Sequence, residues 1–131
     1  MTLNPVVLLD TTVLIDTLRN RKQRPNLLAG LLASGRELAI STISVAEVFG
    51  GLRDGEEPAT RMLLESLDWI PVSGEIAERA GRLKAELRKQ GQTRSIADMV
   101  IAATALENGF SVATDNARDF RIPDLILFPL P

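Results

Sequence analysis

The 131-residue chain contains no cysteine and no histidine, and both absences narrow the chemistry available to it. Without cysteine there are no disulfide bonds, thiolate zinc sites or cysteine nucleophiles. Without histidine there is no serine–histidine or cysteine–histidine catalysis, and no metal site built on imidazole. Any catalysis must therefore use carboxylates, hydroxyls, amides, lysine or arginine, and carboxylates are the first candidates.

An excess of positive charge, a long apolar run and a signal peptide are also missing. The formal net charge is -2, so no global basic field attracts nucleic acid. No apolar run approaches the roughly 18 residues that read as a membrane span. The first ten residues, MTLNPVVLLD, lack the charged start and long apolar segment of a signal peptide. We therefore expect a cytoplasmic protein that does not enter the membrane.

The composition that is present is that of an ordinary globular domain. Hydrophobic residues make up 45% of the chain and charged residues 24%. A chain of 131 residues is the usual size of one domain, and it can bury a sizeable core without disulfides. We expect a single domain over residues 1–131.

The pattern of apolar residues predicts alternating strands and helices. The run Val6-Val7-Leu8-Leu9 suits a strand that is buried on both faces. Further strands are expected at 38–43, 69–72, 110–114 and 126–128, with helices at 13–18, 27–32, 44–50, 59–67, 76–87 and 96–106. This alternation predicts an α/β fold with a central, mostly parallel sheet of four to five strands flanked by helices.

Acidic residues follow several of the predicted strands. Asp10 comes directly after the first strand, and Glu47 lies shortly after the second. Asp115 and Asp119 follow the strand FSVAT, while Asp98 lies in the first turn of a predicted helix. Functional groups in parallel sheets collect beyond the carboxyl ends of the strands. We therefore expect these carboxylates to converge.

Each acid also has a purely structural explanation. Asp10 suits the N-cap of a helix. Ser44 to Glu47 and Ser95 to Asp98 both fit a capping box, in which the acid reaches back to the amide of the cap residue. The two later aspartates are typical turn formers. Capping explains why an acid is tolerated at each position, but it does not explain convergence.

Convergence of carboxylates points to a bound cation. Carboxylates held together repel one another, and some stay protonated unless a cation neutralises them. Magnesium and manganese prefer oxygen ligands, and magnesium bridges to substrate phosphates. An all-carboxylate site without histidine therefore indicates a hard divalent ion acting on a phosphodiester.

Three segments carry a family resemblance. They are VVLLDTTVLID near the start, ISTISVAEVFGGL in the middle, and RSIADMVIAATALENGFSVATDNARDF near the end. In their order and spacing the chain resembles the PIN-domain ribonucleases, and in size and detail the VapC-type toxins of bacterial toxin–antitoxin pairs. The resemblance covers essentially the whole chain.

This resemblance implies specific roles for the acids. Asp10, Glu47 and Asp98 would be catalytic metal-site acids, with Asp10 and Asp98 as the main ligands. Asp119 matches the position where many relatives place a fourth acid, and Asp115 is the second choice. Thr11, Thr12, Thr114 and Asn116 match accessory polar positions. The implied reaction is hydrolysis of RNA by water that one or two Mg²⁺ or Mn²⁺ ions activate.

The implied partners are RNA, a second copy of the chain and a VapB-like antitoxin. Candidate phosphate contacts are the basic residues Arg19, Arg21, Lys22, Arg24, Arg53, Arg88, Lys89 and Arg94. For most of them, an ordinary solvated charge is the alternative interpretation.

Rival functions lack their own motifs. A haloacid-dehalogenase phosphatase needs a second acid two residues after the first, where this chain has Thr12. A response-regulator receiver needs paired acids after its first strand and a lysine at a late strand end. A non-catalytic RNA- or protein-binding module on the same fold stays open, but binding alone would not require a repulsive cluster of acids.

Overall fold

The computed structural model describes residues 5–131, so the first four residues of the predicted single domain lie outside the description. Five strands form one sheet in the order β3-β2-β1-β4-β5, and every neighbouring pair is parallel. The strands are β1 (Val6–Leu9), β2 (Glu37–Ser41), β3 (Asp68–Ile70), β4 (Ser111–Ala113) and β5 (Ile126–Phe128). This architecture confirms the predicted α/β class with its parallel sheet.

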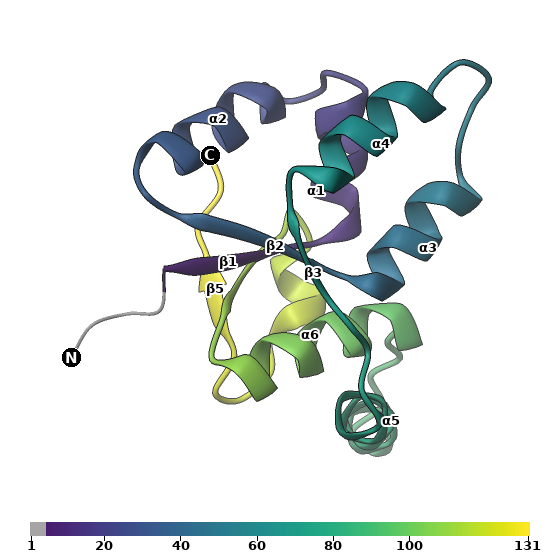
Figure 1. The fold of residues 1–131 in the computed structure, drawn as a ribbon. Coiled ribbons are helices and arrows are strands. Elements are labelled where there is room, and N and C mark those ends of the chain that lie inside the picture. The colour runs from purple at the N-terminus through teal and green to yellow at the C-terminus, as the bar shows by residue number, and fades with distance from the viewer. Residues whose placement is uncertain (1–4) are drawn as a thin grey trace.

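Helices cover both faces of the sheet, as Figure 1 shows. They are α1 (Thr11–Leu18), α2 (Arg24–Ala33), α3 (Thr42–Gly50), α4 (Glu57–Glu65), α5 (Gly74–Lys89), α6 (Ile96–Asn108) and the short 3-10 helix η1 (Ala117–Phe120). Helices α1, α2 and α4 lie on one face and α5 and α6 on the other. Both faces of β1 are therefore covered, which accounts for its fully apolar sequence.

Two hydrophobic clusters, one on each face, form the core. Leu8 of β1 packs with α5 and α6, whereas its neighbours Val7 and Leu9 pack with α1, α2 and α4. Helix α6 is almost entirely buried between Met99 and Ala105 and anchors one face. The alternation of side chains along β1 thus joins both clusters through one central strand.

Several element boundaries differ from the predicted ones. Helix α2 begins at Arg24 rather than Leu27, because Pro25 is well suited to a first helical turn. Helix α4 likewise begins at Glu57 with a proline in its first turn, inside the stretch predicted to be a loop. The predicted turn after β4 is a 3-10 helix, and β3 lies at the edge of the sheet, where Pro71 just beyond it is tolerated because a proline cannot donate to a central ladder.

The order of the strands reverses its direction at β1. The chain passes from β1 to β2 and β3 on one side, then returns to place β4 on the other side of β1. In open parallel sheets, ligands bind at this reversal, beyond the carboxyl ends of the strands. Asp10 follows β1 and Thr114 follows β4, so both lie at this point.

Candidate metal centre

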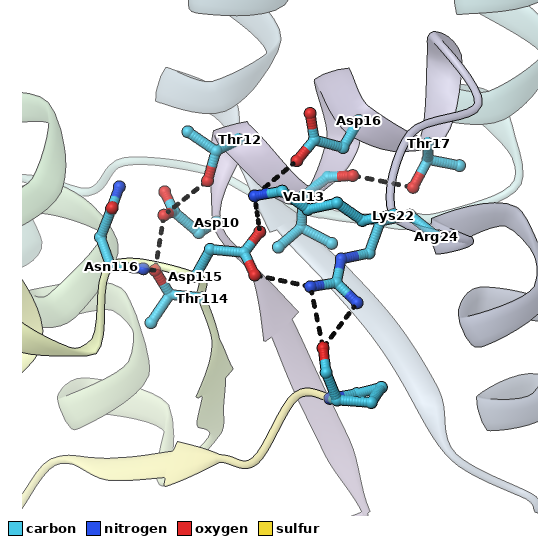
Figure 2. A network of polar contacts seen from close by, with 11 residues as sticks. Asp10, Thr12, Val13, Asp16, Thr17, Lys22, Arg24, Thr114, Asp115 and Asn116 are labelled. Atoms are coloured by element: carbon cyan, nitrogen blue, oxygen red, sulfur yellow. Dashed lines mark hydrogen bonds and ion pairs between the residues drawn. The ribbon is translucent and has the colours of Figure 1, made fainter.

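Asp10 lies buried at the carboxyl end of β1, with 2% of its surface exposed. Its carboxylate caps α1 by accepting from the Thr11 N–H at 2.7 Å, so the predicted N-cap role is confirmed. The other carboxylate oxygen accepts from the hydroxyls of Thr114 at 2.8 Å and Thr12 at 3.2 Å (Figure 2). The Thr114 bond joins the ends of the neighbouring strands β1 and β4.

Burial raises the pKa of Asp10, and the nearby Asp98 carboxylate raises it further. The hydrogen bonds from Thr114, Thr12 and the Thr11 amide act in the opposite direction, because they favour the charged form. The protein thus provides hydrogen-bond donors for an ionised Asp10 carboxylate, although burial makes that charge unfavourable. A bound cation would remove that penalty.

Asp98 reaches the same region from the first turn of α6. The hydroxyl of the N-cap residue Ser95 accepts from the Asp98 N–H at 3.1 Å, which is half of the predicted capping box. Burial is the main cause that raises the pKa of Asp98, and the charges of Asp119 and Glu47 add to it. Asp98 therefore lies within electrostatic reach of Asp10, Glu47 and Asp119 together.

Glu47 is not part of a capping box, and that prediction is wrong. Ser41 is the N-cap of α3 and its side chain accepts from the Ile43 N–H, so the helix starts before Ser44. Glu47 instead lies in the second turn, where its carboxylate accepts from the Thr11 hydroxyl at 2.7 Å. The Ser44 hydroxyl, fully buried, is hydrogen-bonded to Thr11 at 2.9 Å.

The structure separates the two candidates for the fourth acid. Asp119, on η1, is half-exposed, and its carboxylate raises the pKa of Asp98. Asp115 is ion-paired with Arg24 at 2.6 Å and with Lys22 at 3.5 Å, as Figure 2 shows. Its charge is already balanced by these two cations, which favours Asp119 as a metal-site acid.

Asn116 supports the site through its backbone. Its N–H donates to the Thr114 hydroxyl at 2.9 Å, and that hydroxyl in turn donates to Asp10. This chain of two bonds fixes the loop after β4 against the end of β1. The three threonines of the predicted accessory set thus all contact a carboxylate of the site.

The donor set fits a hard divalent cation. Magnesium and manganese prefer oxygen ligands such as carboxylates. Burial and neighbouring acids raise the pKa values of Asp10 and Asp98, so a cation bound here would stabilise their charged forms. Within residues 5–131, no three acidic side chains lie close enough together to coordinate one ion directly. Magnesium needs only one or two carboxylates and keeps several waters, so the wider spacing suits it.

The predicted phosphate contacts fall into different environments. Arg24 is 2% exposed and bonded to Asp115 and to the Pro131 carbonyl, which disfavours a direct contact with RNA. Arg19 is paired with Glu56, and Lys22 with Asp16 and Asp115. Lys22 is nevertheless exposed, as are four candidates that form no ion pair within 4.0 Å in the described part of the chain: Arg21, Arg53, Arg88 and Lys89.

Arg94 is the candidate next to the site. Its guanidinium Nε lies 3.9 Å from a carboxylate oxygen of Asp119, and its charge lowers the pKa of Asp98. Two further arginines that sequence reasoning missed, Arg118 and Arg121, line a surface hollow together with Arg94. Their position near the RDF segment was the available signal, and only the fold brings them beside the loop before α6.

Comparison with known proteins decides the family. The family model described as PIN domain matches residues 7–124. The chain belongs to the PIN-domain family. Ribonuclease VapC19 of Mycobacterium tuberculosis is 34% identical over 119 residues, covering 90% of this PIN domain chain and 95% of the relative. Ribonuclease VapC10 of the same organism is 35% identical, over 88% of this chain and 86% of the relative.

Solved structures of similar proteins share the fold of this PIN domain. VapBC2 from Rickettsia felis, bound to a DNA fragment from its promoter, matches with a TM-score of 0.80 and 27% identity, over 94% of this chain and 97% of that one. A toxin–antitoxin complex from Klebsiella pneumoniae matches with a TM-score of 0.74 and 33% identity, over 92% and 95%.

Proposed function

We propose that this protein is a metal-dependent ribonuclease, the toxin of a VapBC-type toxin–antitoxin pair. The observation that carries the proposal is the group of carboxylates around Asp98, with Asp10 buried at the carboxyl end of the central strand. Its relatives over nearly the whole chain are named ribonucleases. The carboxylate site supplies a chemical reason for that activity in this chain.

In the proposed site, Asp10 and Asp98 would hold the ion, Mg²⁺ or Mn²⁺. A bound ion of this kind makes a water nucleophilic near neutral pH and offsets the charge that develops on the phosphodiester. Glu47 and Asp119 orient the water or accept its proton, and the Thr11 hydroxyl fixes the Glu47 carboxylate. Water then adds to phosphorus as the P–O bond to the leaving nucleotide breaks.

The positions of Asp10 and Thr114 favour catalysis over simple binding. Binding RNA alone would gain from positive charge, whereas the Asp10 and Asp98 carboxylates repel phosphate, and the charge of Asp98 raises the pKa of Asp10. The N-cap role of Asp10 accounts for its bond from the Thr11 N–H, but not for the two hydroxyl donors, Thr12 and Thr114, that its other carboxylate oxygen accepts from. The non-catalytic alternative is therefore disfavoured.

RNA cleavage with defined metals tests the proposal. Purified protein, free of antitoxin, is incubated with structured and unstructured RNA in Mg²⁺, Mn²⁺ or EDTA. We expect cleavage with either metal, none in EDTA, and losses of about 100-fold or more in Asp10→Asn and Asp98→Asn. Asp54→Asn removes an exposed carboxylate elsewhere and serves as the matched control. Cleavage that persists in EDTA or in both site variants contradicts the proposal.

The antitoxin has a candidate binding place in this structure. A hollow between α1 and α3 is lined by the apolar residues Ile15, Leu18, Val48 and Leu52, and the ion-paired Arg19 and Glu56 with Gly51 complete its lining. It suits an apolar side chain presented by a partner segment. We expect the chain to form a complex when co-expressed with the product of the adjacent reading frame, and Leu18→Asp to weaken that complex in size-exclusion chromatography. An unaffected complex would place the antitoxin elsewhere.

A homodimer is part of the same proposal. Met62 of α4 and Trp69 of β3 are exposed to 76% and 46%, and burying this apolar surface against a second copy would favour association. Light scattering of the purified chain distinguishes a dimer from a monomer.

No helix among residues 5–131 is long and apolar enough to cross a membrane.

A further inference from the structure

A surface hollow beside the carboxylate site is lined by three arginines. Arg94 comes from the loop between α5 and α6, whereas Arg118 and Arg121 come from η1 and the residue after it. The remaining lining is Gly91, Gln92 and Thr93, which add small or polar groups. Two segments distant in the sequence thus form one basic concavity.

Arg94 is held in a fixed orientation between this hollow and the acids. Its side chain is 12% exposed, and it donates to the backbone carbonyls of Asp119 at 3.2 Å and Arg118 at 3.4 Å. The side-chain carbonyl of Gln92 accepts a further bond from the guanidinium at 3.1 Å. The Lys84 ammonium donates to the Arg94 carbonyl and brings a fourth cation close by. A guanidinium fixed in this way loses little entropy when it binds an anion.

Positive charge is concentrated in the hollow although the whole chain carries a formal net charge of -2. Arg118 and Arg121 are exposed, and no ion pair within 4.0 Å involves either of them in the described part of the chain. Arg19 and Arg24, by contrast, are paired with acids. Cations that crowd together without acidic partners gain most from an external anion, and Arg recognises phosphate with two donors at once.

We propose that this hollow binds an internal phosphate of the RNA strand, next to the phosphodiester that is cleaved. The inference rests on the proposed function, since it places the substrate strand across the carboxylate site. Asp119 joins the two regions, because its carboxylate acts on Asp98 while its carbonyl accepts from Arg94. An RNA strand bound at the arginines would therefore have its neighbouring phosphodiester next to the acids.

The test compares two charge-matched double variants. Arg118→Gln with Arg121→Gln removes the exposed cations of the hollow. Arg61→Gln with Arg82→Gln removes the same charge from α4 and α5, where these side chains are 58% and 77% exposed in helical i,i+4 pairs. All four residues lie at the surface, so both variants should fold, which circular dichroism verifies.

Steady-state cleavage of a short single-stranded RNA with hydroxyl ends gives the first result. We expect KM to rise about tenfold in the Arg118/Arg121 variant, with the effect in KM rather than kcat, and less than about twofold in the control. The slope of log affinity against log salt should fall by about 0.7 for each phosphate that is no longer neutralised. Equal KM values in the two double variants would overturn the proposal.

Binding to the Asp98→Asn protein separates this proposal from the proposed function. Fluorescence anisotropy in Mg²⁺ measures affinity for intact RNA whether or not the wild type cleaves. Weaker binding only in the Arg118/Arg121 background supports the hollow even if cleavage is never observed. An effect seen only with 5′-phosphorylated RNA would identify a terminal phosphate as the ligand and overturn the internal-phosphate assignment.

Discussion

Arg24→Met tests the polar network that holds the loop after β4. Arg24 is 2% exposed, and its guanidinium donates to Asp115 at 2.6 Å and to the Pro131 carbonyl at 3.4 Å (Figure 2). Lys22 and Gln23 precede it with φ values of 52° and 55°, in the left-handed region that non-glycine residues rarely adopt. The ion pairs to Asp115 stabilise this turn as well as the loop that carries Thr114.

The size of the stability loss depends on the partners and the solvent contact that Asp115 keeps after Arg24 is replaced. Breaking a fully buried ion pair costs about 3–5 kcal/mol, because the remaining charge has no partner. Asp115 keeps Lys22 at 3.5 Å and has 20% of its side chain exposed, so its residual charge is partly solvated. The buried Arg24 Nε has no hydrogen-bond partner among residues 5–131, so removing it relieves a desolvation cost and offsets part of the lost stability. We expect a net loss of about 2–3 kcal/mol.

Thermal denaturation in EDTA measures this loss without any contribution from metal. A loss of this size lowers the Tm of a chain this long by roughly 6–12 °C. Asp115→Asn alone should lower the free energy of unfolding by less than Arg24→Met does. The double variant Arg24→Met with Asp115→Asn should be more stable, by at least about 1 kcal/mol, than the sum of the two single losses implies. A Tm within about 2 °C of wild type for Arg24→Met, or strict additivity, would refute the assigned coupling.

Three further predictions concern the carboxylates, whose pKa values are raised in the folded protein. A raised folded pKa means that the contribution to stability is greatest below the unfolded pKa, about 3.9, and is lost as pH rises through the folded pKa. Asp10→Asn should therefore raise the Tm by a few degrees at pH 7.5 in EDTA, while abolishing cleavage. Mg²⁺ should raise the wild-type Tm more at pH 8 than at pH 5, because protons compete with the metal. Thr114→Val removes a donor that lowers the pKa of Asp10, so the acidic limb of the pH–rate profile should move to higher pH; an unmoved limb would show that Asp10 does not control it.

Much of the fold can be predicted because short apolar runs alternate with helical patterns, and β1 and β5 are wholly apolar. The pattern places Val6–Leu9 and Ile126–Phe128 to the residue; Pro5 and Asp10 bound the first run, and Pro129 ends the second. It misplaces the start of α3, because the polar run Ser41-Thr42 can end a strand or cap a helix equally well. Only the pairing of β2 with β3 up to Ser41 decides between these alternatives.

The site is predictable in its residue types but not in its contacts. Acids at strand ends converge in a parallel sheet, so Asp10 can be named from the sequence, and Asp98 can be named from its place in the first turn of a predicted helix. The spacing of Asp115 and Asp119 cannot distinguish them, because Arg24 lies 91 residues away from its partner Asp115. The same holds for Arg118 and Arg121, whose role depends on the distant loop that carries Arg94.

Direct measurement of Mn²⁺ binding tests the central claim that the carboxylates around Asp98 hold the catalytic ion. Calorimetric titration of wild type, Asp98→Asn and Asp115→Asn gives the affinity and the stoichiometry of each without any RNA. The account predicts that Asp98→Asn weakens Mn²⁺ binding at least about tenfold, whereas Asp115→Asn stays within about threefold of wild type. Equal binding by wild type and Asp98→Asn, or a selective loss in Asp115→Asn, would contradict it.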